Sequence, residues 1–388
     1  MSLRLDKLGV AIAAIAAWGA FFAPFAVFRA NRIVAGEPRS ILEALPAPGG
    51  LLLLAVLAAA ALAAAMRIPV RIRLTLAVAI LAAVAVSLGI AARHLTPEGN
   101  SYARVSPGSG FWLLIFAFVL LLADALTRLR LPPLGRIGVL IGAAAAIGLL
   151  LYSGNWDSLS ILKEYANRAD SFWSEAGRHV TLALGSLAAA VITGIPLGVL
   201  CHRVDAIREP ILNVLNIIQT IPSIALFGIL IAPLGWIALN VPGAAAIGIR
   251  GIGVAPAFVA LFLYSLLPMV ANTVVGLAGV PETANDAARG MGMTDRQRLW
   301  GVEFPLAFPV VLTGIRVVLV QNIGLATVAA LIGGGGFGVF VFQGIGQTAM
   351  DLVLLGAVPT VALAFAAAIT LDALVELVSR PGTAGEPS

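Results

Sequence analysis

Long apolar runs constrain this chain more than any other feature. About ten runs of roughly twenty apolar residues follow one another, separated by polar segments. A helix of about 20 residues spans the hydrocarbon core of a bilayer. The residues are 60% hydrophobic and 11% charged, whereas soluble domains carry about 25% charged residues. The sequence therefore predicts an all-α integral membrane protein with about ten transmembrane helices.

The basic residues set the expected topology. The predicted spans lie near residues 8–28, 50–66, 74–92, 111–127, 134–152, 180–201, 211–232, 255–278, 307–331 and 353–378. Arginine is concentrated in two short connections, 66–73 and 127–136, and short basic loops stay in the cytoplasm. We therefore expect both termini in the cytoplasm. The same placement explains the net charge of +5, so no nucleic-acid partner is expected.

The first apolar run follows Arg4 and Lys7, as in a secretory signal. The run is too long for the apolar region of a signal peptide and lacks a clear small-residue cleavage site. We expect an uncleaved anchor. A cleaved signal peptide is the alternative, and it leaves the later topology unchanged.

A polar stretch at 281–305 interrupts the apolar pattern, and the topology places it in the cytoplasm. Pro281 suits the start of a helix, and Thr283 with Asp286 forms a capping pair. Gly290 and Gly292 tolerate left-handed backbone and would end that helix.

A second short helix is expected directly after those glycines. Thr294 and Gln297 form another capping pair, and the helix would run over about Asp295–Val302 and end at Phe304-Pro305. The prediction is a helix–glycine–helix elbow. The side chains expected to be exposed on it are Arg289, Arg296, Arg298 and Trp300.

This elbow resembles the hallmark loop of permease subunits from binding-protein-dependent ABC importers. The family pattern is Glu-Ala-Ala, three residues, Gly, nine residues, then Ile-x-Leu-Pro. Here Asp286-Ala287-Ala288, Gly292 and Val302-Glu303-Phe304-Pro305 keep every spacing, with Asp for Glu, Val for Ile and Phe for Leu. The segments 219–227, 288–294 and 329–338 look like the glycine betaine/carnitine/choline, or osmoprotectant, branch.

The resemblance implies a domain plan. Residues 179–380 would form a five-helix type I ABC importer permease core with its coupling loop at 281–305. Permeases with an extra N-terminal bundle occur in this branch, which suits a five-span accessory bundle at 1–152. An extracytoplasmic amphipathic connector is expected at 153–178 and a cytoplasmic tail at 381–388.

The resemblance also implies partners. In that family the loop inserts into a cytoplasmic ABC ATPase, and the residues carried over by the motif are Asp286, Ala287, Ala288, Gly292 and Pro305. Arg289 and Arg296 are our own candidates for charge contacts with the ATPase. A substrate-binding protein outside the cell and a second copy or homologous permease would complete the importer in the bacterial cytoplasmic membrane.

The chain itself shows no catalytic machinery. It contains no Gly-Lys-Ser or Gly-Lys-Thr, the end of a phosphate-binding loop, and the glycine-rich run 333–338 leads into apolar residues. We expect no enzyme activity, no metal site and no cofactor on this chain, with ATP and magnesium bound by the partner ATPase.

The central polar side chains of the predicted core are uncharged. They are Gln219, Thr220, Asn272, Gln321 and Asn322. We interpret them as lining a translocation path for a zwitterion or a cation, and interhelical hydrogen bonding is the competing interpretation.

The expected function is therefore ATP-driven import of an osmoprotectant such as glycine betaine. Methionine or a polar amino acid is the alternative substrate. An ion-coupled secondary transporter is a weaker alternative, because it requires ionisable residues near the membrane midplane.

Overall fold

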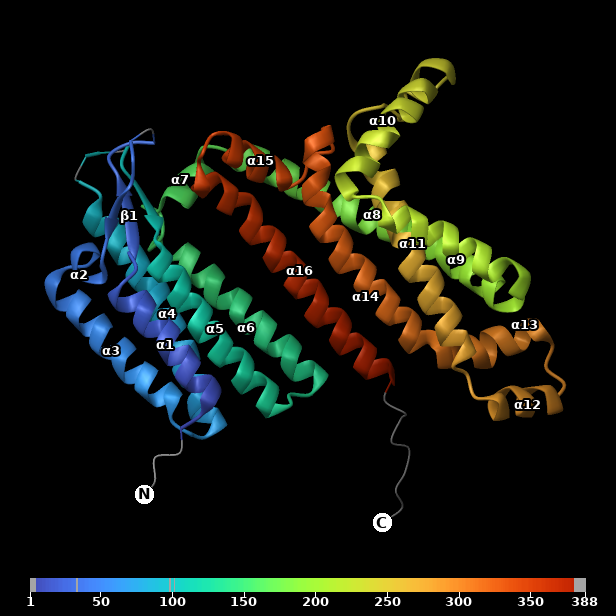
Figure 1. The fold of residues 1–388 in the computed structure, drawn as a ribbon, viewed down its shortest axis with the longest axis horizontal. Coiled ribbons are helices and arrows are strands. Elements are labelled where there is room, and N and C mark those ends of the chain that lie inside the picture. The colour runs from blue at the N-terminus through green and yellow to red at the C-terminus, as the bar shows by residue number, and fades with distance from the viewer. Residues whose placement is uncertain (1–4, 33, 98, 101, 380–388) are drawn as a thin grey trace, which may run out of the picture. The chain divides into compact units, whose positions relative to one another are not determined.

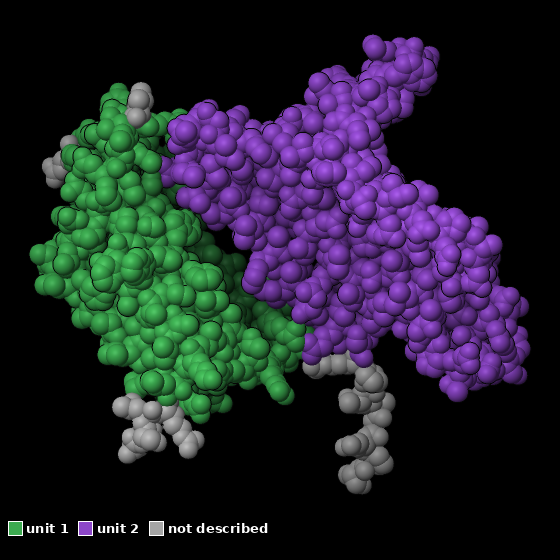
Figure 2. Space-filling view, viewed as in Figure 1, with its two compact units in different colours: residues 1–167 green, residues 168–388 purple. Residues whose placement is uncertain are grey.

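The computed structural model describes residues 5–379 except 33, 98 and 101. The chain forms two compact units, Met1–Asn167 and Arg168–Ser388 (Figure 2). The described residues include nine helices long and apolar enough to cross a membrane, together with one shorter apolar helix. The expected tail, 381–388, and residue 380 at the end of the expected core lie outside the described residues.

Unit 1 is built around a bundle of five apolar helices. These are α1 (Lys7–Phe21), α3 (Ala47–Ala65), α4 (Val70–Leu95), α5 (Ser109–Leu129) and α6 (Pro133–Tyr152). The shorter elements are β1 (Ala26–Arg29), β2 (Glu37–Arg39), α2 (Ile41–Ala44), β3 (Arg104–Pro107) and α7 (Ser160–Ala166). Helix α1 packs against α3 and α5, and α4 packs against α5 (Figure 1).

Helix α1 is shorter than the span predicted at 8–28. It has 15 residues, about 22 Å of helix, which is less than a bilayer core of roughly 30 Å. The chain leaves the helix at Phe22 and passes Pro24, which cannot donate a backbone hydrogen bond. The apolar residues that follow form strand β1 instead of continuing the helix.

A three-stranded antiparallel sheet lies at one end of the unit 1 bundle, in the order β2-β1-β3 (Figure 1). Val27 pairs with Pro38 on one side and with Ser106 on the other. Pro38 lies in an edge strand, where proline is tolerated. This sheet is absent from the prediction, because the sequence of its central strand continues the first apolar run.

Helix α6 differs from the other helices of unit 1. Pro133 is its only buried residue, and none of the residues in its apolar 18-residue stretch is buried in the protein. An apolar helix that buries so little of its surface in protein is stable where lipid is its solvent.

The expected connector, 153–178, is divided between the two units. Its first part packs into unit 1, where Leu159 pairs with Val105 and Glu164 in α7 is buried. Its last ten residues are the start of a long helix that begins at Ala169.

Unit 2 contains the remaining apolar helices. The membrane-length elements are α8 (Ala169–Arg203), α10 (Ser223–Asn240), α11 (Val254–Ala278), α14 (Phe304–Val328) and α16 (Met350–Ser379). The shorter ones are α9 (Asp205–Thr220), α12 (Glu282–Gly290), α13 (Asp295–Arg298), a π-helical turn (Leu299–Glu303), a 3-10 turn (Ala329–Ile332) and α15 (Gly338–Gly346). Helix α11 packs against α8 and α14, and α14 packs against α16.

The span predicted at 211–232 is two helices. Helix α9 ends at Thr220, Ile221 is extended, and α10 starts after Pro222. Proline disfavours helical backbone in the residue before it, which accounts for the break. Helix α10 extends away from the body of unit 2 (Figure 1).

Small residues allow α8 and α11 to approach closely. A Cβ atom on Gly198 would lie 2.5 Å from the Thr273 Cβ, and one on Gly194 would lie 2.8 Å from the Met269 Cβ. Such contacts require glycine, as is common where helices pack in lipid.

We predict that Gly198→Ala lowers the thermal stability of the purified protein in detergent, because the new methyl group overlaps Thr273. The expected loss is about 1–3 kcal/mol, typical of overpacking. Gly177→Ala in the same helix is the matched control, since its Cβ would meet nothing within 4 Å. The control should raise stability by up to about 1 kcal/mol through helix propensity. Equal melting temperatures for the two variants would contradict this packing.

Candidate functional site

The elbow, residues 281–305, begins with helix α12. Pro281 is its N-cap residue and makes no side-chain cap, and Thr283 lies inside the helix. The predicted capping pair of Thr283 and Asp286 is therefore wrong: proline, with its fixed backbone angle, starts the helix two residues earlier. Gly292 has φ of +77°, as predicted, whereas Gly290 is the last helical residue.

The second half of the elbow is continuous with a membrane helix. Thr294 and Gln297 form the predicted capping box at the start of α13. The predicted end at Phe304-Pro305 is wrong, because the π-helical turn leads from α13 straight into α14. Pro305 lies in the first turn of α14, directly after the π-helical turn.

Arg298 is buried, contrary to the prediction that it is exposed. Its side chain is 6% exposed, and it contacts the Glu303 carboxylate at 2.8 Å and the Asp295 carboxylate at 3.0 Å. The other three residues of that prediction, Arg289, Arg296 and Trp300, are exposed.

Glu303 joins the elbow to helix α8. Its carboxylate is 4% exposed and accepts from Arg298 through one oxygen and from Arg203 through the other, the latter at 2.6 Å. We call these three residues the Glu303 clamp. Sequence reasoning passed over Glu303 as an unspecified position of the motif. The sequence feature that could have indicated a buried role for Glu303 is its position between two apolar residues, Val302 and Phe304.

Apolar contacts reinforce this attachment. Leu277 and Val280, at the end of α11, are buried with Ala307 of α14, and Val199 of α8 and Leu299 pack against them. The ends of α8, α11 and α14 thus pack against the elbow and support it.

The exposed side of the elbow carries most of the residues predicted to contact the ATPase. Asp286, Ala287, Arg289, Arg296 and Pro305 are exposed. Asp286 and Arg289 lie 3.5 Å apart and are 71% and 62% exposed, so their ion pair is worth at most about 1 kcal/mol. Both charges are therefore available to a partner.

Ala288 lies on the opposite side of α12 and is 1% exposed. Helix α12 packs against α13 and the π-helical turn. A small residue at this position holds α12 close to the rest of the elbow.

A pocket of about 350 Å³ lies at the break between α9 and α10. Gln219, Thr220 and Gln321, three of the five residues predicted to line a translocation path, line it together with Tyr264. The Gln219 amide donates to the Tyr264 carbonyl at 2.9 Å, and the Tyr264 hydroxyl donates to the Ile221 carbonyl. Tyr264 was not among the predicted residues, and its hydroxyl supplies the hydrogen bond that the Ile221 carbonyl needs at the break.

The other two residues of that set lie elsewhere. Asn322 is fully buried, and its amide donates to the hydroxyls of Ser186 and Ser265, each at 2.9 Å. Asn272 donates to the Pro268 carbonyl of its own helix at 2.7 Å. These contacts are interhelical or local hydrogen bonds, and a path-lining role for the two asparagines stays a prediction.

The glycine-rich run 333–338 makes its own contacts within unit 2. The Gly336 N–H donates to Glu175 at 2.6 Å and the Phe337 N–H to His179 at 3.3 Å. Within the described part of the chain, no group of three or more histidine, cysteine, aspartate or glutamate side chains is placed to hold a metal ion.

Comparison with known families matches both units. Residues 190–380 match the model described as binding-protein-dependent transport system inner membrane component. Residues 6–162 match the model described as ABC transporter permease YehY, N-terminal domain.

Curated relatives match over about half of this chain. The osmoprotectant import permease protein OsmW of Salmonella typhimurium is 43% identical over 46% of this chain and 79% of its own length. The choline transport system permease protein OpuBB of Bacillus subtilis is 36% identical over 52% of this chain and 84% of its own. The glycine betaine/carnitine/choline transport system permease protein OpuCB of the same species is 34% identical over 54% and 87%.

Among solved structures, a chain of the inward-facing MetNI methionine ABC transporter is 22% identical, with a TM-score of 0.47. The match covers 55% of this chain and 96% of that one.

We predict that Glu303→Gln loosens the elbow, because the buried Arg298 loses its charged partner. Removing one member of a buried ion pair costs about 3–5 kcal/mol. The Asp295 carboxylate remains beside Arg298, so a loss of about 3 kcal/mol is expected. Trypsin should then cleave faster after Arg289 and Arg296.

Asp205→Asn is the matched control for this variant. It removes an acceptor whose side chain is 87% exposed, so the change should stay within about 1 kcal/mol. Unchanged tryptic cleavage and melting in Glu303→Gln would refute the clamp.

Proposed function

Because this chain belongs to the inner-membrane components of binding-protein-dependent transport systems, we propose that it is the permease subunit of an ATP-driven importer for osmoprotectants such as glycine betaine. The chain is a multi-pass membrane transport component. The substrate class is supported by the relatives, whose names specify osmoprotectants, choline, carnitine and glycine betaine.

The observation that carries this proposal is the geometry of the elbow. An exposed helix, α12, is attached through a buried ionic clamp and apolar packing to the ends of α8, α11 and α14. A flexible loop with a purely solvated surface needs no such support. A loop that transmits force from a partner needs it, because a deformable attachment would absorb the movement.

The ATPase is proposed to be a separate cytoplasmic subunit that holds the ATP and magnesium, so this chain binds no cofactor. Asp286, Ala287 and Arg289 on the exposed side of α12 would enter its cleft, and Arg296 and Pro305 would lie at the rim. Movement of the elbow would pass to α8 through Glu303. It would pass to α16 through α14, since Arg316 in α14 and Asp372 in α16 form an ion pair at 2.6 Å.

The proposed translocation path includes the pocket at the break between α9 and α10. Gln219, Thr220 and Gln321 offer amide and hydroxyl groups without net charge. Such groups suit a zwitterion or a quaternary ammonium ion in transit, because a charged site would hold one end of the solute too tightly. Selective binding would belong to an extracytoplasmic binding protein, and a second copy or a homologous permease would complete the path.

The function is tested by uptake of labelled glycine betaine into cells that lack other betaine transporters. Cells that express this chain with its ATPase and binding protein should accumulate betaine, and omission of the ATPase should abolish uptake. Uptake without the ATPase would indicate a secondary transporter. Uptake of labelled methionine instead of betaine would overturn the substrate assignment while retaining the ATP-driven mechanism.

We predict that Gly292→Val abolishes co-purification of the ATPase without preventing membrane insertion. Gly292 has φ of +77°, where a β-branched residue is strained by about 1–3 kcal/mol, so the turn between α12 and α13 would change direction. Gly290→Ala is the matched control, since Gly290 is helical and its Cβ would meet nothing within 4 Å. Co-purification at the level of the control would count against the coupling role of the elbow.

A further inference from the structure

Unit 1 contains a closed ring of four charged side chains, which the transport mechanism does not use. Asp6 contacts Arg73 at 2.9 Å and Arg128 at 3.2 Å, and Asp124 contacts the same two arginines at 3.0 and 2.9 Å. The ring joins the start of α1, the first turn of α4 and the end of α5. It is electrically neutral, because each carboxylate is matched by one guanidinium group.

Asp6 stays ionised in this ring at physiological pH. A hydrogen bond from Arg73, assisted by one from the Gly9 N–H, lowers the pKa of the Asp6 carboxyl to about 2. The lowered pKa stabilises the fold above the ordinary carboxyl range, and this contribution disappears only as the pH falls through about 2. The carboxylates therefore neutralise the two arginines and leave nothing to neutralise further cations.

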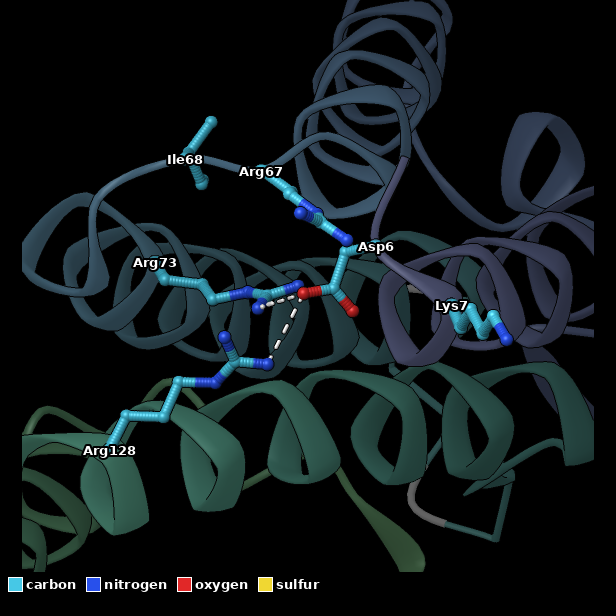
Figure 3. A pocket seen from close by; sticks show the side chains of 6 residues that line it. All are labelled: Asp6, Lys7, Arg67, Ile68, Arg73 and Arg128. Atoms are coloured by element: carbon cyan, nitrogen blue, oxygen red, sulfur yellow. Dashed lines mark hydrogen bonds and ion pairs between the residues drawn. The ribbon is translucent and has the colours of Figure 1, made fainter. Parts of the chain in front are cut away.

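Two further cations lie beside the ring. Lys7 and Arg67 line, with Asp6, Arg73 and Arg128, a pocket of about 390 Å³ (Figure 3). Among the described residues neither Lys7 nor Arg67 has an ion-pair partner. Four cationic side chains against the two carboxylates of the ring leave a surplus of two positive charges.

Arg73, which lines the pocket, also carries a buried donor without a partner. Arg73 is 1% exposed, and its Nε atom has no hydrogen-bond partner in the protein. A buried N–H group without an acceptor costs free energy, and a water molecule or a bound ion would satisfy it. The surplus of positive charge among the side chains that line the pocket favours an oxyanion.

The pocket lies where apolar helices end. Leu8 in α1 follows Lys7 in the sequence, and Ile72 in α4 precedes Arg73. Both are apolar and exposed. Exposed apolar side chains at a helix end suit acyl chains, and basic pockets between helix ends suit anionic head groups. The positive-inside pattern of residues 66–73 assigns this end to the cytoplasmic side.

We propose that this pocket binds the phosphate oxyanion of an anionic phospholipid from the cytoplasmic leaflet. Arg67 contacts the phosphate, Lys7 adds its positive charge at the edge of the pocket, and the neutral ring holds Arg73 and Arg128 in place behind the phosphate. The acyl chains lie along the exposed apolar side chains of α1 and α4. Free phosphate shares the same chemistry but lacks the chains.

The test measures lipid binding to the purified full-length protein in detergent by native mass spectrometry and by thermal shift. The probes are phosphatidylglycerol, phosphatidylcholine and inorganic phosphate. Each cation near a membrane surface contributes about 1 kcal/mol to anionic lipid binding, and 1.4 kcal/mol is a factor of ten in affinity. The double variant Lys7→Gln/Arg67→Gln should therefore bind phosphatidylglycerol about 10- to 30-fold more weakly, with phosphatidylcholine binding unchanged.

The matched control is Arg71→Gln/Arg130→Gln, which removes two exposed cations near the same helix ends but outside the pocket lining. It should bind phosphatidylglycerol like the unaltered protein. An equal loss in both double variants would overturn the pocket in favour of diffuse charge attraction. Inorganic phosphate that competes fully with the lipid at similar concentration would overturn the lipid assignment. If the double variant has a lower melting temperature than the unaltered protein in phosphatidylcholine, the binding measurement is repeated with the single variant Arg67→Gln. This variant should bind phosphatidylglycerol more weakly than the unaltered protein does, and equal binding would overturn the proposal.

Discussion

A single buried carboxylate connects the polar elbow of this protein to its membrane helices. Glu303 accepts from Arg298 inside the elbow and from Arg203 at the end of α8, and it is 4% exposed. A charge removed from water must be paired, so neither contact can be given up without leaving an uncompensated ion. These ion pairs therefore fix the elbow to the end of α8. The proposed coupling to an ATPase rests on this constraint.

The same requirement for satisfied polar groups shapes the membrane interior. The helical backbone is interrupted at Ile221 and Pro222. An interruption within apolar surroundings leaves backbone polar groups that must find other partners. The Tyr264 hydroxyl supplies one, and Gln219 in turn binds the Tyr264 backbone. The polar side chains that line the pocket at the break are consequently uncharged.

Some local features of the elbow were predicted correctly, although the capping pair of Thr283 and Asp286 was not, because Pro281 starts α12. The capping box of Thr294 and the left-handed Gly292 depend only on neighbouring residues, and both are present. The first span was predicted too long and the span at 211–232 as unbroken, because apolar periodicity does not distinguish a helix from a strand or from two helices around a proline. The sheet of unit 1 pairs Val27 with Ser106, and no local pattern reports such a distant partner.

The sequence alone determined that this chain is a membrane protein with a polar elbow of fixed spacing, since apolar run length, basic loops and cap residues act over a few positions. Only the tertiary structure decided which charges are buried. It pairs Glu303 with Arg203 across 100 residues and Asp6 with Arg73 across 67. It also places Arg298, which was expected at the surface, in the buried Glu303 clamp. An ion's partner depends on how helices pack in three dimensions, and that information is distributed over the whole chain.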